Sequence, residues 1–213
     1  MNGYHFTFCG TYCVALASGA LYLSQHRLLC VSDLHLGKSE RIARRSGMML
    51  PPYEVQETLQ KLCDDIAVTS PTRVICLGDS FDDLDAAQSL SAEMRLWLTG
   101  MQAGRDWVWI EGNHDPGPMD FGGTHRSEMQ FGALTFRHIA TDAAAEISGH
   151  YHPKHRLAGR SKPAFLYDKD RLIMPAYGAY TGGLASHAPD LRKLFRNAPI
   201  AIMTGSKAIP VPT

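Results

Sequence analysis

The stretch LLCVSDLHLG, residues 28–37, joins a run of apolar, β-favouring residues to two side chains that can bind metal, Asp33 and His35. Such a run predicts a buried strand, and the polar residues after it predict a loop at the carboxyl end of that strand. Four further runs precede candidate ligands: RVICLG before Asp79, WVWIEG before Asn113, ALTFR before His138 and AEISG before His150. Ligands in α/β sheets bind just beyond the carboxyl ends of strands, so five such loops can form one pocket.

Three of these junctions place a glycine directly before the candidate ligand: Gly78, Gly112 and Gly149. We expect glycine there because a chain that leaves a strand must turn sharply and approach a bound ion closely. The candidate ligands are imidazole, carboxylate and amide groups without a thiolate, which suits Mn, Fe or Zn better than Ca, with Mn²⁺ as the first choice. Two divalent ions about 3.5–4 Å apart need a shared anionic ligand to offset their repulsion, and Asp79 is the candidate bridge.

The order of the motifs resembles that of the calcineurin-like metallophosphoesterase superfamily. The motifs read Asp33-Leu-His35, Gly78-Asp79-Ser-Phe-Asp82, Gly112-Asn113-His114-Asp115, His138 and Gly149-His150-Tyr-His152. They span residues 33–152, whereas GNHD alone would be weak evidence. The resemblance implies an α/β fold, the four-layer metallophosphoesterase sandwich, in which two packed mixed β-sheets are flanked by helices.

The resemblance also implies a role for each residue of these motifs. The first metal would be held by Asp33, His35, Asp79 and His152, and the second by Asp79, Asn113, His138 and His150. A hydroxide held between the two ions would attack phosphorus. His114 is left without a metal and would be the general acid that protonates the departing oxygen, a step typically worth about 10² to 10⁴ in rate. Asp82 would orient or charge His114.

Several of these side chains have a structural alternative. Asp83 and Asp85 could simply cap a helix that begins near residue 85, since acidic side chains favour a helix N-terminus. Asp115 could hold its loop through backbone hydrogen bonds. A lone histidine such as His138 is ordinarily a surface or core residue, but its place after a strand-like run favours a ligand. A solvated or structural role is expected for the histidines outside the motifs: His5, His26, His125, His155 and His187.

Length and composition are those of a single domain over residues 1–213, with 45% hydrophobic residues and a net charge of zero. Zero net charge excludes a global basic field of the kind that a strong non-specific nucleic-acid binder carries. Five cysteines without a C-x-x-C motif, with Cys30 and Cys76 in apolar runs, indicate buried reduced thiols and a cytoplasmic location. The absence of Lys or Arg before Arg27 argues against a signal peptide, and no apolar run is long enough to span a membrane.

Local patterns predict the remaining elements. We expect a hairpin that turns at Ser18-Gly19, helices over residues 38–47, 53–68 and 85–99, a second hairpin over residues 164–178 and a closing strand over residues 200–205. Alternation of strands and helices in the first half, with more strands later, predicts two packed sheets flanked by helices.

Within the superfamily, the chain most resembles the small bacterial phosphoesterases known as ligase-associated DNA damage response endonucleases. The segments that carry this resemblance are VSDLHLGKSE at 31–40, ICLGDSFDD at 75–83, EGNHDPGP at 111–118, LTFRHIA at 134–140, ISGHYHPKHRL at 147–157 and LIMPAYGAYTGGL at 172–184. The resemblance implies a Mn-dependent phosphodiesterase that cuts single-stranded or unpaired DNA in repair, together with a DNA ligase, a nuclease and a helicase. That family commonly carries His at the position of Asp82, and we expect Asp82→His to raise nuclease activity.

Support for DNA in the residues themselves is local. Basic side chains follow the first and last metal motifs, and Lys38, Arg41, Arg45 and Lys154 are the candidate contacts to substrate phosphates. Alternatively, these are solvated surface charges. A second hypothesis is a small-molecule phosphoesterase that acts on nucleotides or cyclic nucleotides with the same metals, which fits zero net charge. A scaffold without enzymatic activity is disfavoured because every expected ligand is present.

Overall fold

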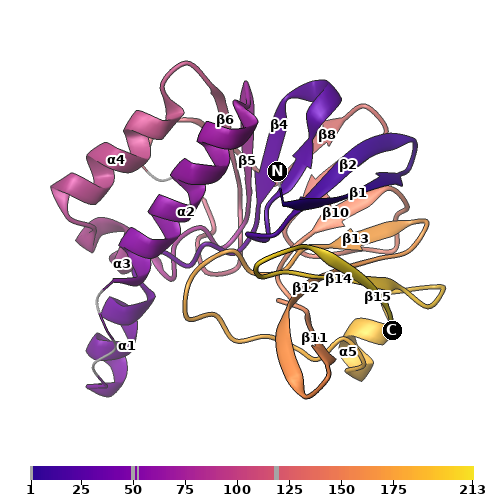
Figure 1. The fold of residues 1–213 in the computed structure, drawn as a ribbon. Helices are drawn as coiled ribbons and strands as arrows, with labels where there is room; N and C mark the ends of the chain where they lie inside the picture. The colour runs from indigo at the N-terminus through magenta and orange to yellow at the C-terminus, as the bar shows by residue number, and fades with distance from the viewer. Residues whose placement is uncertain (1, 49–50, 52, 118–119) are drawn as a thin grey trace.

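The computed structural model of the protein describes residues 2–48, 51, 53–117 and 120–213, so Pro118, the last residue of the 111–118 segment, lies outside the described residues. Two β-sheets pack face to face in the middle of the molecule, with helices against both outer faces (Figure 1). This arrangement confirms the predicted fold class, two packed mixed β-sheets flanked by helices.

The first sheet follows the order of the chain. Its described strands are β1 (Gly3–Phe8), β2 (Thr11–Leu16), β3 (Leu21–Leu23), β4 (Leu28–Val31), β5 (Arg73–Leu77), β6 (Asp106–Ile110) and β7 (Thr124–Arg126). Strands β1 to β4 pair antiparallel, and β4 to β7 pair parallel. The carboxyl ends of β4, β5 and β6 therefore lie at one edge, where Asp33, Asp79 and Asn113 follow them.

The second sheet has the order β15-β14-β12-β13-β10-β9-β8 among the described residues. Its strands are β8 (Glu128–Phe131), β9 (Leu134–Arg137), β10 (Glu146–Ser148), β12 (Arg160–Tyr167), β13 (Arg171–Ile173), β14 (Ile200–Met203) and β15 (Ile209–Pro212), and β11 (Lys154–Leu157) pairs with β12 outside this path. Strands β9, β10 and β13 are parallel neighbours. Their carboxyl ends bring His138, His150 and residues 174–178 to the same edge.

The core has three layers, which strand β4 illustrates. Leu29 and Val31 pack with the helices on the outer face of the first sheet, whereas Leu28 and Cys30 pack between the two sheets. This alternation follows from the two-residue period of a strand. The third layer lies on the outer face of the second sheet, against the short helix α5 (Pro189–Arg192). All five cysteines are free, and Cys30 and Cys76 are buried as predicted.

Two of the three predicted helices match the structure, and the short helix α5 was not predicted. Helix α1 (Lys38–Ser46) ends at Gly47 in the left-handed conformation, and α2 (Glu54–Thr69) follows close to its expected bounds. The single helix expected over residues 85–99 is wrong, because the structure has two, α3 (Leu84–Ser89) and α4 (Ala92–Gln102). The Ser91 side chain accepts a hydrogen bond from the Met94 N–H and so starts a new helix. Asp83 caps α3 in the same way, through the Ala86 N–H.

Within the described residues, no helix combines the length and the apolar character that crossing a membrane requires.

Candidate metal centre

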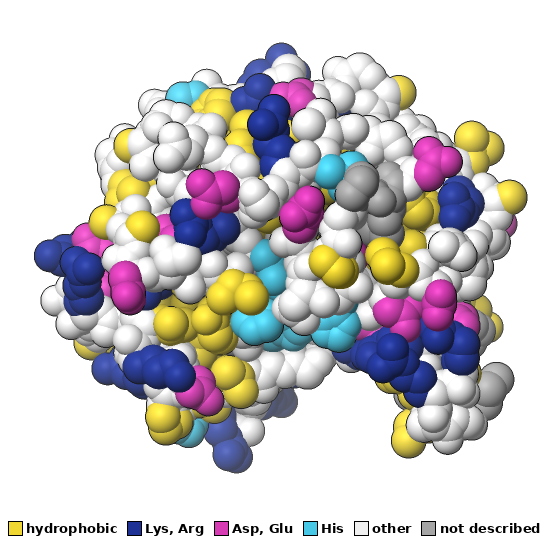
Figure 2. All heavy atoms as spheres, turned by 180° about the vertical axis from the view of Figure 1, so that it is seen from behind, with side chains coloured by type: hydrophobic (Ala, Val, Ile, Leu, Met, Phe, Trp, Pro, Cys, Tyr) yellow, Lys and Arg dark blue, Asp and Glu magenta, His cyan; other side chains and the backbone are white. Residues whose placement is uncertain are grey.

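The predicted metal ligands gather at the shared edge of the two sheets. In Figure 2 several histidine side chains lie together near the centre of one face of the molecule, and others lie apart from them. Among the described residues, three groups have ligand atoms within 4.8 Å of one another: the first cluster, Asp33, His35 and His152; the second cluster, Asp79, His138 and His150; and a third group, His35, Asp82 and His114. The five strand-loop junctions therefore converge on one place, as the sequence predicts.

The first cluster directs two imidazole nitrogens and a carboxylate at the same point. His152 Nε2 lies 3.0 Å from Asp33 Oδ1 and 3.3 Å from His35 Nε2. Two imidazole lone pairs at this separation need a proton or a cation between them, so the donor set fits a divalent metal. Burial would raise the pKa of Asp33, but hydrogen bonds from His152 and Ser32 and the charges of His152 and His138 lower it. The carboxylate is thus anionic at neutral pH.

The second cluster is held by the main chain as well as by charge. His138 Nδ1 donates to the Leu77 carbonyl at 3.0 Å, which leaves Nε2 facing Asp79 Oδ2 at 3.3 Å and Asn113 Oδ1 at 3.0 Å. His150 Nδ1 lies 3.3 Å from the same Nε2. Burial alone would lower the pKa of His138, but the Asp79 and Asp33 carboxylates raise it to about 8. Asn113 therefore joins this cluster, as predicted.

Asp79 contacts the second cluster through its carboxylate and the first through its main chain, and its role as the bridge stays a prediction. Its carboxylate faces His138, and its main-chain carbonyl accepts the His35 N–H at 2.9 Å. Burial opposes ionisation of Asp79, but the hydrogen bond and charge of His138, together with the His114 N–H, lower its pKa to about 2.

The backbone is strained where the predicted ligands lie. Five of the seven predicted ligands have the left-handed conformation: Asp33 (φ 55°), His35 (φ 46°), Asp79 (φ 46°), His150 (φ 69°) and His152 (φ 47°). This conformation costs a residue with a side chain roughly 1–2 kcal/mol, and it persists only where the surrounding structure imposes it. Such strain clusters at functional sites. It therefore supports a functional site here independently of the chemical type of the side chains.

Glycine allows one ligand loop to pack against the next. A Cβ atom on Gly78, whose φ is +77°, would lie 2.3 Å from His138 Nδ1. A Cβ atom on Gly149 would lie 1.9 Å from Ser32 Oγ. The glycines thus allow a close approach to the neighbouring ligand loop, whereas the predicted approach to a bound ion stays a prediction.

Asp82 lies close to His114, but the two are joined through the main chain of Asp82 and not through its carboxylate. Asp82 Oδ1 lies 2.7 Å from His35 Nδ1, and its other oxygen accepts from Arg41 Nε. His114 Nδ1 instead donates to the main-chain carbonyl of Asp82, at 2.9 Å. The reason is helix α1, which follows His35 directly and brings Lys38 and Arg41 over the buried carboxylate. In Asp82→His an imidazole would face these two cations, and the expected gain in nuclease activity stays a prediction.

His114 lies beside the first cluster, with its ring centroid 5.3 Å from that of His35. Its main-chain N–H donates to Asp79 Oδ1 at 2.8 Å. Because a carbonyl only accepts, Nδ1 carries the proton in the contact with Asp82, and Nε2 is the nitrogen that remains for substrate.

Asp115 holds the loops together. Its carboxylate accepts from the main-chain N–H groups of Ser80, Phe81 and Gly112 at 2.7, 3.2 and 3.0 Å. The structural alternative is therefore the one observed for Asp115. Burial, with the nearby Asp79 charge, raises its pKa to about 6 against the effect of those hydrogen bonds.

The candidate phosphate contacts divide into two groups. Lys38 and Arg41 lie at the edge of the metal centre, both beside Asp82. Arg45 is paired with Asp83 on the surface, and Lys154 Nζ donates to the Thr181 carbonyl at 3.2 Å. Figure 2 likewise shows Lys and Arg side chains among Asp and Glu.

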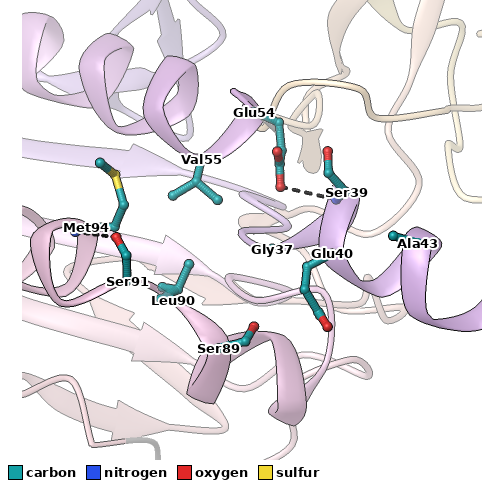
Figure 3. Close-up of a pocket in the computed structure, with 10 residues that line it drawn as sticks. All are labelled: Gly37, Ser39, Glu40, Ala43, Glu54, Val55, Ser89, Leu90, Ser91 and Met94. Atoms are coloured by element: carbon teal, nitrogen blue, oxygen red, sulfur yellow. Dashed lines mark hydrogen bonds between the residues drawn. The ribbon is translucent and has the colours of Figure 1, made fainter. Parts of the chain in front are cut away.

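Helix α1 is tied to the rest of the molecule by Glu54. The buried Glu54 carboxylate accepts from the Ser39 N–H at 3.1 Å, where its charge also favours the helix N-terminus. Figure 3 shows the two side chains facing one another in a pocket of about 320 Å³ between α1, α2, α3 and α4. None of the predicted metal ligands lines this pocket. Its bearing on the metal centre is through α1, which carries Lys38 and Arg41.

Residues 177 and 178, to which the sequence assigned no role, support the Asp33 loop through main-chain hydrogen bonds. The Tyr177 N–H donates to the Ser32 carbonyl at 2.7 Å, and the Gly178 N–H donates to the Asp33 carbonyl at 3.0 Å. Lys61 of α2 fixes this loop by donating to the Tyr177 carbonyl and lying over the Tyr177 ring, 3.9 Å from its centroid. The resemblance of residues 172–184 to the endonuclease family could have pointed to this loop, because that segment lies outside the superfamily's metal motifs.

Comparisons with known proteins agree with this geometry. Residues 26–199 match the model of the calcineurin-like phosphoesterase family. Among solved structures, the nuclease MPE of Pseudomonas putida is similar, with a TM-score of 0.81 and 24% identity over 99% of this chain and 100% of that chain. A predicted phosphoesterase of Streptococcus pneumoniae matches with a TM-score of 0.33 and 14% identity, over 87% of this chain and 97% of that chain. Comparison with curated proteins gives no significant match.

Proposed function

This chain belongs to the calcineurin-like phosphoesterase family and is a metal-dependent phosphoesterase, and we propose that it is an endonuclease that hydrolyses single-stranded or unpaired DNA in repair. One observation carries the proposal. Two ligand clusters lie at one sheet edge, and His114 lies beside them with its Nε2 not used by the Asp82 contact.

The first cluster with Asp79 would hold one divalent cation, and the second cluster with Asn113 would hold the other. Mn²⁺ is the first choice, with Fe or Zn as alternatives, since the donors are nitrogen and oxygen. When bound, two such ions polarise the phosphoryl oxygens and bring the pKa of a water toward neutrality, so that hydroxide can attack phosphorus.

His114 is the proton donor in this proposal. Its Nδ1 proton is held by the Asp82 carbonyl, so the protonated ring gives up the proton on Nε2. The main-chain N–H of His114 donates to Asp79 Oδ1 and holds the His114 backbone beside the proposed bridging ligand. A general acid at this place matters most for a poor leaving group such as the alkoxide of a DNA strand.

The DNA substrate is supported by two observations of different kinds. A solved structure that is similar over 99% of this chain, that of the Pseudomonas putida protein, is described as a nuclease. Lys38 and Arg41 lie beside the candidate centre, where they can meet a phosphate backbone.

A small-molecule phosphoesterase is the second candidate, favoured by the pairing of cations on α1. Arg44 contacts Glu40, Asp83 and Asp85, so much of the positive charge of α1 is neutralised within the protein. A nucleotide or cyclic nucleotide needs fewer phosphate contacts than a DNA strand.

The test compares a chromogenic diester, a chromogenic monoester, a nucleotide and single-stranded DNA, each with and without Mn²⁺. We expect metal-dependent cleavage of the diester and of DNA, with a rate on DNA that falls as salt rises. His114→Ala should lose DNA cleavage by about 10²- to 10⁴-fold and lose less on the diester with its good leaving group. Diester hydrolysis without DNA cleavage would refute the nuclease proposal and leave the metal centre intact.

A further inference from the structure

The loop over residues 178–184 passes along the first cluster. At one end the Gly178 N–H donates to the Asp33 carbonyl at 3.0 Å. At the other end Gly183 is so close to the main chain of His152 that a Cβ atom there would lie 2.1 Å from the His152 carbonyl oxygen. Tyr180 is two residues from Gly178, and two residues of chain span at most about 7 Å. Tyr180 therefore belongs to a short turn whose two ends contact the main chain of Asp33 and of His152.

Hydrogen bonds fix the loop on both sides of Tyr180. The Ala179 N–H donates to Thr58 Oγ1 of α2 at 3.1 Å. On the other side, the Thr181 carbonyl accepts from Lys154 Nζ at 3.2 Å. Thr181 Oγ1 also donates to the Gly178 carbonyl at 3.1 Å and closes the turn around Tyr180. Hydrogen bonds to Thr58 of α2 and to Lys154 of β11 thus set the position of Tyr180.

Tyr180 has two unusual properties for a tyrosine. Its φ is +57°, in the left-handed region that bulky residues rarely adopt. Its side chain is 43% exposed, whereas Tyr177, three residues earlier in the same segment, is 0% exposed and donates to Asp65 Oδ2 at 2.8 Å. Tyr177 is therefore a packing residue, and the strain at Tyr180 places an aromatic ring in solvent. In Figure 2 hydrophobic side chains lie directly beside the histidines.

We propose that Tyr180 is a substrate-binding residue whose ring stacks on an unpaired nucleobase next to the phosphate in the metal centre. This inference rests on the proposed DNA function and deepens it. Stacking on an aromatic side chain is tolerant of base identity, because every base has a flat π-face. It requires a base that is free of its partner strand, so Tyr180 supplies a physical basis for a preference for single-stranded or unpaired DNA.

The test measures kcat/KM on a single-stranded oligonucleotide and on a strand of equal length in which every base is replaced by an abasic tetrahydrofuran unit. The wild-type protein should prefer the base-bearing strand by about 5- to 150-fold, the range for one stacked base. Tyr180→Asn should lose most of this preference, since Asn tolerates the left-handed backbone but has no ring. Tyr180→Phe keeps the ring and should keep the preference.

The outcomes separate the two proposals. If Tyr180→Asn lowers kcat/KM equally on both strands, or keeps the wild-type preference, the ring does not stack on a base and the inference is overturned while DNA cleavage stands. If neither strand is cut by the wild-type protein although the chromogenic diester is hydrolysed, the DNA function itself fails, and the role of Tyr180 fails with it.

Discussion

The carboxylate of Asp82 lies 2.7 Å from Nδ1 of His35, on the far side of the ring from the first cluster. Burial would raise the pKa of Asp82, but contact with His35, Arg41 and Lys38 lowers it, so the group is anionic. A negative charge at this distance favours a proton on Nδ1 of His35, which leaves the Nε2 lone pair for a metal. Asp82 is therefore a positioning residue for a predicted ligand.

Asp82→Asn should weaken metal binding more than it affects the fold. Loss of a carboxylate behind a ligating histidine typically costs about 10- to 100-fold in metal affinity. Titration with Mn²⁺ measures this change. Asp83→Asn is the matched control, because Asp83 caps α3 and contacts none of the predicted ligands. Equal affinities of Asp82→Asn and wild type would contradict the assignment.

Gly78→Ala should disrupt the second cluster through a direct clash. Its Cβ would lie 2.3 Å from His138 Nδ1, so the imidazole must move. Gly132→Ala is a control with similar backbone strain, since φ is +58° and a Cβ there meets no atom within 4 Å. Both variants should lose about 1–2 kcal/mol of stability from the left-handed backbone, and Gly78→Ala should lose more and bind metal more weakly. Chemical denaturation and Mn²⁺ titration of the pair decide this.

Metal should stabilise the protein, and Asp79→Asn should remove most of that effect. A ligand at about 100 times its Kd contributes about 2.7 kcal/mol, which raises the Tm of a domain of this size by roughly 5–10 °C. Asp79 is the proposed bridging ligand, so loss of its negative charge should weaken both proposed sites. Thermal melts with Mn²⁺ and with a chelator measure the shift. Asp106→Asn, which removes a surface carboxylate paired with Arg73, should keep it.

Lys61 should make stability depend on pH in the alkaline range. Burial lowers its pKa from 10.5 to about 8, against the charges of Asp65 and Glu57. Between these two values the unfolded chain binds more protons than the folded chain, so the free energy of unfolding rises with pH. Relative to Lys61→Met, the wild-type protein should gain on the order of 2 kcal/mol from pH 8 to 10.5. Urea unfolding across this range tests it, and a constant difference would count against a buried Lys61.

Elements whose signal is local were predictable. The strand before Asp33 alternates in the buried sheet, and Gly47 ends α1 because a left-handed C-terminal residue favours glycine. The prediction of one helix over residues 85–99 was wrong because the apolar periodicity continues through Leu90. Ser91 nevertheless starts a new helix, since its side chain accepts a hydrogen bond from the Met94 N–H. Strand β15 was missed because two of its four residues are proline, which β-sheets accept only at an edge, where β15 lies.

The sequence by itself determined the family of the site, because the ligand types and their strand-loop junctions are written in contiguous residues and in their order along the chain. Only the tertiary structure decided which histidine Asp82 serves. That choice depends on where α1 places Lys38 and Arg41, through contacts between residues that are far apart in the sequence. The tertiary structure also showed that residues 177 and 178 support the Asp33 loop. These contacts are main-chain hydrogen bonds, so the side-chain types do not reveal them. The ligand types are thus set by short sequence motifs, whereas the orientation of the ligand side chains depends on tertiary packing.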